Sequence, residues 1–447
     1  MSVAVMKTKA ETALAEAFDG VADALPGGDK AKSARAAAIG RFAQNGLPNR
    51  RIEEWKYTDI KGAIKEVLPL AVADQTKTTI ADVIVAMGAL GRLEVPRFVL
   101  VNGRYRKELS NLDGLDGVTV GSFADALSSD AAAAALAIGE EDRGTDAVLA
   151  LNSAYATDGV VIDVAAGAKV GAPLLVVHVR AGNRPQRYVT RNQISVGDGA
   201  QITIVEMFIA VPGSAVEALI NTASEVHVGS AANVNHIKVT TDLGAATHLV
   251  NWLVEMQSDA VYRGFHYTSG VGLARNQVRA TFKGEDVKLD LSGAFLARNA
   301  EHIDTTLFVD HAVPAGESRE LFKGVLDDEA RGIFQGKVVV RPDAQKTDGK
   351  QMAQALMLSE TCEFDSKPEL EIYADDVVCG HGSTSAAIDE DLLFYLRARG
   401  IPLDEARALL IQSFIGEAID KVEHEGVREA LMNEAEIWLA AGARNKG

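Results

Sequence analysis

One segment of the chain places a thiol and an imidazole two residues apart, in Cys379-Gly380-His381. If a strand ends near Cys379, the alternation of side chains along a strand puts Cys379 and His381 on the same face. A thiolate and an imidazole on one face suit zinc, copper or iron–sulfur chemistry. The competing interpretation is structural, because a lone cysteine is most often a small buried apolar residue. The spacing alone leaves both interpretations open.

The residues after this pair have the pattern of helices, so we expect the chain to be helical from Gly382 to its end. Asp389 can cap the first helix, leucines follow it at helical spacing, and Gly400 can close it. Pro402 allows a second helix, which carries Leu410 and Phe414 on one apolar face. These helices either hold a partner helix or cap the end of the preceding structure.

The part of the chain before the pair is rich in strand signals. From about Val148, short runs of Val and Ile alternate with turn residues such as Gly197-Asp198-Gly199. A sandwich, a propeller and a solenoid all fit such a pattern, and the loose repeat favours a β-helix solenoid. We therefore predict a mainly β protein with three parts: a helical or mixed N-terminal domain (1–146), a β-helix core (147–378) and a C-terminal helical domain (379–447).

Two features of the N-terminal part carry predictions. Trp55 and Tyr57 lie among close opposite charges, which suggests a helix that docks these aromatic rings on the body of the protein. Nucleotide stacking is the alternative for these rings. The run Arg97–Tyr105 predicts a hairpin that turns at Asn102-Gly103.

Composition limits the classes of function. The 447 residues carry a net charge of −17, which disfavours nucleic acid or an anionic membrane surface as the main partner. No apolar run is long enough to span a bilayer, and the first residues lack a secretory signal. The two cysteines, Cys362 and Cys379, fit a reducing compartment and provide no disulfide framework. We expect a cytoplasmic protein.

The motifs of common enzymes are absent. The sequence contains no phosphate-binding P-loop, no Gly-x-Ser-x-Gly elbow and no His-Glu-x-x-His pair. His302 and His311 flank a segment with two aspartates, where either a hydrolase acid–base site or satisfied structural histidines are conceivable, the latter being favoured. We therefore expect a non-enzyme.

Several motifs together resemble a known family. They are Cys379–Thr384 with Leu393–Gly400, Phe334–Val338 and Asp365–Ile372. They are similar to the signatures of the SufB/SufD family of iron–sulfur cluster assembly proteins, and Arg51–Thr58 is similar to its SufD branch. The chain departs from the family at Gly380, where serine is common, and at the pair Ser385-Ala386, while the Cys and His are kept.

The resemblance implies a right-handed parallel β-helix core flanked by helical N- and C-terminal parts. It also implies a non-catalytic subunit that pairs with SufB through the end of the β-helix and binds the ATPase SufC through the C-terminal helices. The sequence leaves open whether the chain alone forms a homodimer. The expected partner-interface residues are Phe394, Tyr395, Arg399, Leu410 and Phe414.

The number of available ligands then restricts the role of Cys379 and His381. An iron–sulfur cluster usually takes four protein ligands, and this chain offers Cys379 and His381, with Cys362 expected in the core. A nascent cluster would therefore lie at an interface shared with SufB, and none is expected on the isolated chain. Two alternatives remain: a purely structural adaptor without a ligand role, and a β-helix carbohydrate-active enzyme, which the missing secretory signal disfavours.

Overall fold

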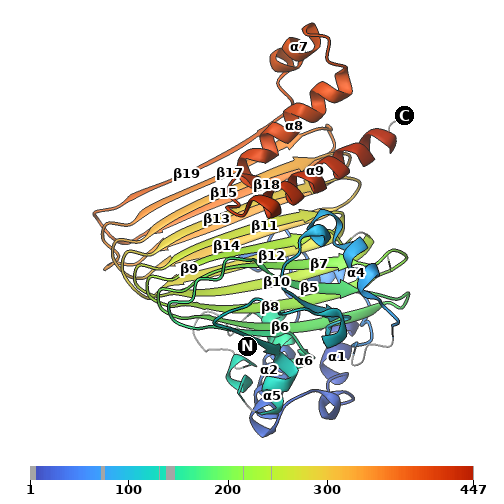
Figure 1. Ribbon diagram of the computed structural model, residues 1–447, viewed down its shortest axis with the longest axis vertical. Coiled ribbons are helices and arrows are strands. Elements are labelled where there is room, and N and C mark those ends of the chain that lie inside the picture. Colours follow the sequence, from blue (N-terminus) through green and yellow to red (C-terminus); the bar gives the residue numbers. More distant parts are fainter. Residues whose placement is uncertain are drawn as a thin grey trace.

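The computed structural model describes residues 7–71, 76–129, 131–136, 146–214, 216–242 and 244–445. Two sheets wind into one parallel β-solenoid, in which consecutive strands alternate between the sheets (Figure 1). One sheet has ten strands in the order β19-β17-β15-β13-β11-β9-β7-β5-β1-β2, and the other has nine in the order β18-β16-β14-β12-β10-β8-β6-β4-β3. The prediction of a mainly β protein with a parallel solenoid core and helical ends is confirmed.

The solenoid strands are mostly about ten residues long. The odd-numbered strands are β5 (Leu174–Arg180), β7 (Gln201–Ala210), β9 (Asn233–Thr240), β11 (Val261–Ser269), β13 (Lys288–Ala297), β15 (Glu317–Leu326), β17 (Asp348–Met357) and β19 (Val378–Ala386). The even-numbered strands are β4 (Val160–Val164), β6 (Gln186–Val196), β8 (Ala218–Val228), β10 (Gly244–Met256), β12 (Val271–Phe282), β14 (His302–His311), β16 (Arg331–Val340) and β18 (Glu363–Ile372).

One corner of the solenoid repeats the same backbone conformation in successive turns. A residue in the left-handed region recurs there, bonded through its N–H to the next turn: the Gly199 N–H donates to the Ser230 carbonyl at 2.7 Å, and the Ala231 N–H to the Ser258 carbonyl at 2.9 Å. Glycine adopts this conformation without a steric penalty, whereas Ala231, at φ 55°, adopts it at some cost. The recurrence of this corner accounts for the loose repeat seen in the sequence.

The N-terminal part covers one end of the solenoid and also contributes strands to it. The Arg97–Tyr105 hairpin is confirmed as β1 (Arg97–Val101) and β2 (Arg104–Tyr105), and β1 pairs in parallel with β5. Strand β3 (Val118–Ser122) extends the other sheet through β4. The helices are α1 (Lys9–Glu16), η1 (Ala22–Ala24), α2 (Asp29–Asn45), η2 (Glu53–Trp55), α3 (Ile60–Ala63), α4 (Ile80–Ala86), η3 (Gly88–Arg92), η4 (Lys107–Leu109), α5 (Phe123–Ser128), η5 (Ala133–Leu136) and α6 (Ala147–Tyr155).

The C-terminal part differs from its prediction at its start. Strand β19 continues to Ala386, so the chain is not helical directly after Gly382, and a strand crosses the predicted boundary between 378 and 379. The reason is pairing: Thr384 and Ala386 remain in register with Gln354 and Leu356 of β17. Three helices follow: α7 (Glu390–Ala398), α8 (Leu403–Ile419) and α9 (Glu425–Asn445).

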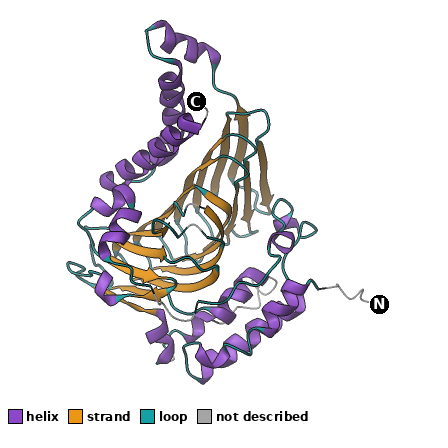
Figure 2. Cartoon of the chain, turned by 90° about the vertical axis from the view of Figure 1, so that its right-hand side faces the viewer, coloured by secondary structure: helices purple, strands orange, loops and turns teal. Residues whose placement is uncertain are grey.

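These helices are arranged in two ways. Helices α8 and α9 lie along the ten-stranded sheet, and α7 projects beyond the last strand (Figure 2). Asp389 caps α7 by accepting hydrogen bonds from the Asp391 and Leu392 N–H groups, and Gly400, at φ 86°, follows its end. Over the described ranges, no helix is both long and apolar enough to cross a membrane.

Candidate functional site

Cys379 and His381 lie on β19, the last strand of the ten-stranded sheet. Cys379 is in register with Gly349 of β17, and His381 with Gln351. Both residues border one hollow of about 450 Å³ at this end of the molecule, together with Glu320 on β15. The alternation that the sequence predicted therefore brings the thiol and the imidazole to one place.

The two side chains differ in exposure. The Cys379 thiol is half-buried and packs against the interior of the solenoid, whereas His381 is exposed. Burial raises the pKa of the Cys379 thiol, a backbone hydrogen bond with Gly349 lowers it in part, and the charges of Asp348 and Glu320 raise it further. The thiol is therefore protonated at neutral pH, and a metal ion that binds there must displace its proton.

The carboxyl beside the thiol is also perturbed. Burial raises the pKa of Glu320 to about 8, and the charge of Asp290 acts in the same direction. The Ser318 hydroxyl and Arg319 offset only part of this effect. The Cys379 thiol and the Glu320 carboxyl are thus both held in their neutral forms by the same cause, the removal of water.

The site sits on an open edge. Strand β18 ends the nine-stranded sheet and β19 ends the ten-stranded one, so the outer backbone groups of both face no further strand of the described structure. Exposed apolar side chains accompany this edge, at Ile372, Tyr373 and Val378. An uncovered pair of edge strands is a template for another chain.

The Cys–His pair is an incomplete ligand set. Among the described residues, no group of three or more His, Cys, Asp or Glu side chains is placed to hold a metal ion. Cys362 adds nothing to the site, because it is buried and its thiol contacts the Leu326 carbonyl at 3.5 Å. Its expected place in the core is confirmed.

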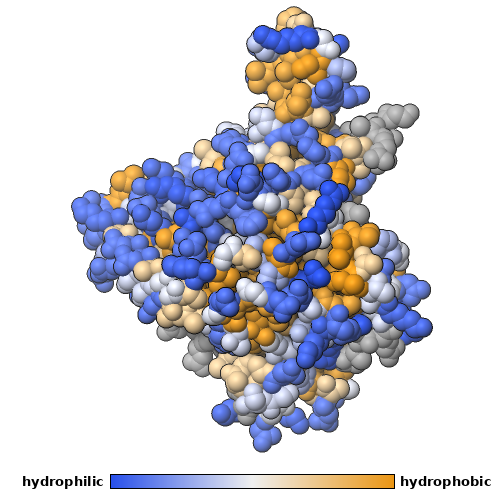
Figure 3. Space-filling view, viewed as in Figure 1, coloured by the Kyte–Doolittle hydropathy of each residue, from blue (hydrophilic) through white to orange (hydrophobic). Residues whose placement is uncertain are grey.

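The five residues expected at a partner interface fall into two groups. Phe394 (74% exposed), Tyr395 and Arg399 lie on or directly after α7, where the guanidinium of Arg399 stacks 3.8 Å from the centre of the Tyr395 ring. The projecting lobe that carries them shows apolar surface (Figure 3). Leu410 and Phe414 lie on α8 and are half-buried.

The two α8 residues contribute to packing as well as to the surface. The Lys323 ammonium lies 4.4 Å from the centre of the Phe414 ring and pairs with Glu417, so this part of α8 is fixed to β15. The side of α8 that is most buried carries Ile411 and Ile415, which the sequence did not single out.

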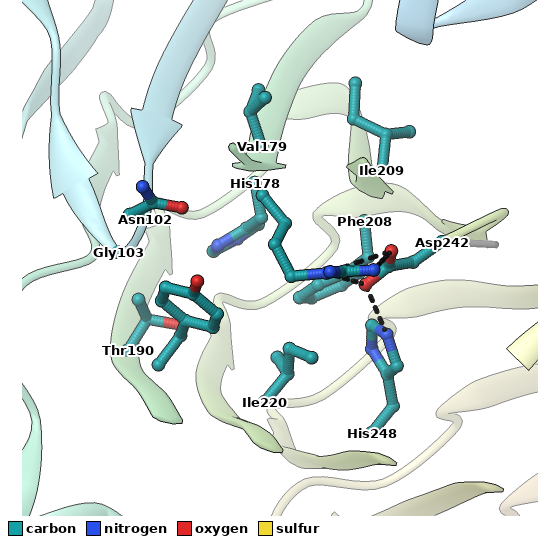
Figure 4. A pocket seen from close by; sticks show the side chains of 12 residues that line it. Asn102, Gly103, His178, Val179, Thr190, Phe208, Ile209, Ile220, Asp242 and His248 are labelled. Carbon is teal, nitrogen blue, oxygen red and sulfur yellow. Dashed lines mark hydrogen bonds and ion pairs between the residues drawn. The ribbon is translucent and has the colours of Figure 1, made fainter. Parts of the chain in front are cut away.

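A second polar pocket lies inside the solenoid and was not predicted. It measures about 30 Å³ and is bordered by His178, Arg180, Asp242 and His248. Asp242 bonds both Arg180, at 2.6 Å, and His248, at 3.0 Å, and Figure 4 shows Asp242 facing His248. Because its charged groups bind one another and the space suits roughly one water molecule, we assign this pocket a structural role.

Other candidates from the sequence also prove structural. His302 bonds the Thr58 hydroxyl at 2.9 Å, and His311 is buried and bonds Ser318 at 3.1 Å. Trp55 is buried with the Arg275 guanidinium 4.5 Å from its ring centre, so that face is closed to a nucleotide base. The predicted docking of Trp55 on the solenoid is confirmed.

Comparison with known proteins identifies two family regions in the chain. Residues 178–414 match the model of the SufBD core domain of the SUF system for FeS cluster assembly, and residues 16–176 match that of the SufBD protein N-terminal region. The core match spans β5 to α8, and so contains β19 and its Cys–His pair.

Alignments with individual relatives extend this result. The chain is 27% identical to the iron–sulfur cluster assembly protein SufD of Escherichia coli, over 90% of this chain and 92% of that protein. It is 29% identical to an iron–sulfur cluster assembly SufBD family protein of Synechocystis, with 84% of each chain covered. It is 28% identical to SufD of Bacillus subtilis, over 64% of this chain and 65% of that protein. The chain therefore belongs to the SufBD family of iron–sulfur cluster assembly proteins.

Proposed function

We propose that this chain is a non-catalytic subunit of an iron–sulfur cluster assembly scaffold that pairs with a SufB chain through the open end of its solenoid. The observation that carries the proposal is the coincidence of two features at one place. The unpaired edges of β18 and β19 lie at the same end as the incomplete ligand pair Cys379 and His381. A second chain docked there would cover the edge and supply the missing ligands.

The cluster itself is the cargo of this interface. Cys379 contributes a sulfur ligand once its proton leaves, and His381 contributes a ring nitrogen from an exposed position. Two donors suffice to hold one side of a nascent cluster, and four ligands are the usual complement. Loading thus depends on the presence of both chains.

The ATPase SufC is proposed to bind α7. Phe394, Tyr395 and Leu392 expose large apolar or aromatic surface on this helix, which projects away from the solenoid. Exposed aromatic residues beside an arginine are typical anchors of protein interfaces. Because α8 joins α7 to the sheet that ends in β19, movement of SufC on ATP hydrolysis would act on the open edge and release the cluster.

Reconstitution with SufB and SufC under anaerobic conditions tests the ligand role. Cys379→Ala and His381→Ala are each expected to lower the iron and sulfide bound per complex, while the complex still forms. Cys362→Ala is the matched control, since it removes the other thiol from the buried core. Full cluster content in both site variants would contradict the ligand role.

A purely structural adaptor is the second candidate, and the exposure of α7 favours it. It predicts that the double variant Phe394→Ala/Tyr395→Ala loses SufC in co-purification, while Cys379→Ala and His381→Ala keep full cluster content. Ile437→Ala, which changes an exposed residue on α9, is the control for surface truncation. The family assignment argues against the third hypothesis, a carbohydrate-active enzyme, because that hypothesis depended on the β-helix fold alone.

A further inference from the structure

Pro368 interrupts the open edge of β18. At the start of this strand the Glu363 N–H donates to the Ala330 carbonyl at 2.9 Å. Just past its end the Tyr373 N–H donates to the Val340 carbonyl, also at 2.9 Å. The register with β16 is unbroken between these two bonds, so the odd-numbered residues of β18 bond β16 and the even-numbered ones turn their backbone groups outward. Pro368 is one of the outward-turned residues, and proline has no N–H to present there.

The same strand also carries charged side chains along its length. Arg331 of the neighbouring strand binds Asp365 at 2.6 Å, and Lys337 binds Glu371 at 2.7 Å. Proline and charged residues on an edge strand are two of the devices by which natural proteins prevent that strand from pairing with another chain. We therefore regard β18 as a guarded edge.

Strand β19 has neither device, although it is the outermost strand of the other sheet (Figure 1). The Val378 N–H donates to the Thr347 carbonyl at 2.9 Å, and the register with β17 is unbroken. The segment Val378–Ala386 contains no Lys, Arg, Asp, Glu or Pro, and its last four residues are exposed. The strand therefore presents an uninterrupted row of outward backbone groups, at Cys379, His381, Ser383 and Ser385.

From this difference between the two edges we propose that a strand of SufB adds to β19, and that Pro368 leaves β18 as an edge that the partner covers without pairing. The proposal rests on the proposed function, which supplies the partner, and it goes further by assigning the pairing to one of the two strands. A strand added to β19 satisfies the outward N–H and C=O groups, and β19 has no charged side chain to desolvate.

This pairing also positions the partner relative to the ligand pair. Cys379 and His381 are two of the residues of β19 whose backbone groups face outward. In an antiparallel ladder, residues of a hydrogen-bonded pair have Cα atoms about 5.5 Å apart and side chains on the same face of the sheet. Partner residues opposite Cys379 and His381 would thus lie within reach of the thiol and the imidazole.

Two matched proline substitutions test the proposal. Ser383→Pro removes an outward N–H from β19, and Ser366→Pro removes one from β18, while the bonds to β17 and β16 are kept. The affinity of each full-length variant for SufB is measured by surface plasmon resonance, after circular dichroism has shown that the variant folds. Ser383→Pro is expected to bind about tenfold or more weakly than the wild type, because a partner carbonyl buried by docking loses its donor. Ser366→Pro is expected to bind like the wild type.

Equal weakening by the two substitutions, or weakening by Ser366→Pro alone, would overturn the proposal and leave docking at the open end in place. Wild-type affinity in both variants would overturn the proposal and also contradict pairing through the open end. The assay needs neither iron nor sulfide, so its result is independent of the ligand role of Cys379 and His381.

Should Ser383→Pro not fold, amide exchange resolved to single residues in the wild-type chain, with and without SufB, decides the question. Exchange is expected to slow more at Ser383 and Ser385 than at Ser366 and Leu370, because only the former gain hydrogen-bond acceptors. Equal slowing at the two pairs of residues would overturn the proposal.

Discussion

Cys379 lies across the β17–β19 pair from Gly349, and a Cβ atom placed on Gly349 would stand 3.6 Å from the Cys379 sulfur. The absence of a side chain at Gly349 therefore leaves one flank of the thiol uncovered. The thiol also makes a hydrogen bond with the backbone of Gly349, which offsets part of the rise in the thiol's pKa. Access to the sulfur and its protonation are thus both set by the neighbouring strand.

Gly349→Ala is expected to slow alkylation of Cys379 by iodoacetamide several-fold, because the new methyl group would contact the sulfur and, at 3.4 Å, the Ser318 hydroxyl. The free energy of unfolding should change by less than about 1 kcal/mol. Mass spectrometry of timed samples measures the rate. Gly380→Ala is the control, since a Cβ there meets no atom within 4 Å. Equal slowing in both variants would contradict the role of Gly349.

The alkylation rate of Cys379 should rise with pH around a midpoint above that of an ordinary cysteine, because burial raises the pKa of its thiol. Asp348→Asn should move this midpoint to lower pH, since removal of a nearby negative charge stabilises the thiolate. Rates measured between pH 6 and 10 test both statements. A midpoint that Asp348→Asn leaves unchanged would contradict the contribution of the Asp348 charge.

Lys238 provides a pH dependence of stability. It is fully buried beside Thr240, and burial lowers its pKa to about 7. The unfolded chain keeps this lysine protonated up to about pH 10.4, so the folded state binds fewer protons above pH 7 and becomes relatively more stable as pH rises. Lys238→Met should therefore stabilise the protein most at pH 6, and its advantage should shrink by roughly 2–3 kcal/mol between pH 7 and 9.

Urea unfolding of both proteins at several pH values measures this difference. Lys323→Met is the control, because the Lys323 ammonium has an acid partner, Glu417. A stabilisation by Lys238→Met that stays constant with pH would show that the buried amine does not change its charge in this range.

Phe414 and Phe394 should differ in their effect on stability, although both are phenylalanines on the C-terminal helices. Phe414 is half-buried under the Lys323 ammonium, so Phe414→Ala should lower the free energy of unfolding by about 1–3 kcal/mol. Phe394 is 74% exposed, so Phe394→Ala should change it by less than about 0.5 kcal/mol. Urea unfolding measures both. Equal losses would mean that α7 packs against the body in solution.

The sequence predicted the solenoid well because alternation of apolar residues with recurrent turns is a strong signal over many strands. It failed at residues 382–386, where Gly, Ser, Thr and Ala have weak strand preference and adopt the strand only through pairing with β17. It also chose a different side of α8, since this helix is apolar around most of its circumference and periodicity cannot then select the buried face.

The polar interior was beyond sequence reasoning for a related reason. An acid such as Glu320, or a histidine such as His248, normally lies at the surface, and only the winding of the strands turns these positions inward. The Cys–His pair was found because its residue types are rare in this chain. Glu320 was missed because glutamate is common in it.

Hydrogen exchange of the backbone amides, with and without the SufB chain, tests most directly whether the open end of the solenoid is the docking edge. The account predicts that exchange slows in β18 and β19 when SufB is added, and that it stays unchanged in α2 at the opposite end of the molecule. Slowing confined to the N-terminal helices, with β18 and β19 exchanging as in the isolated chain, would contradict it.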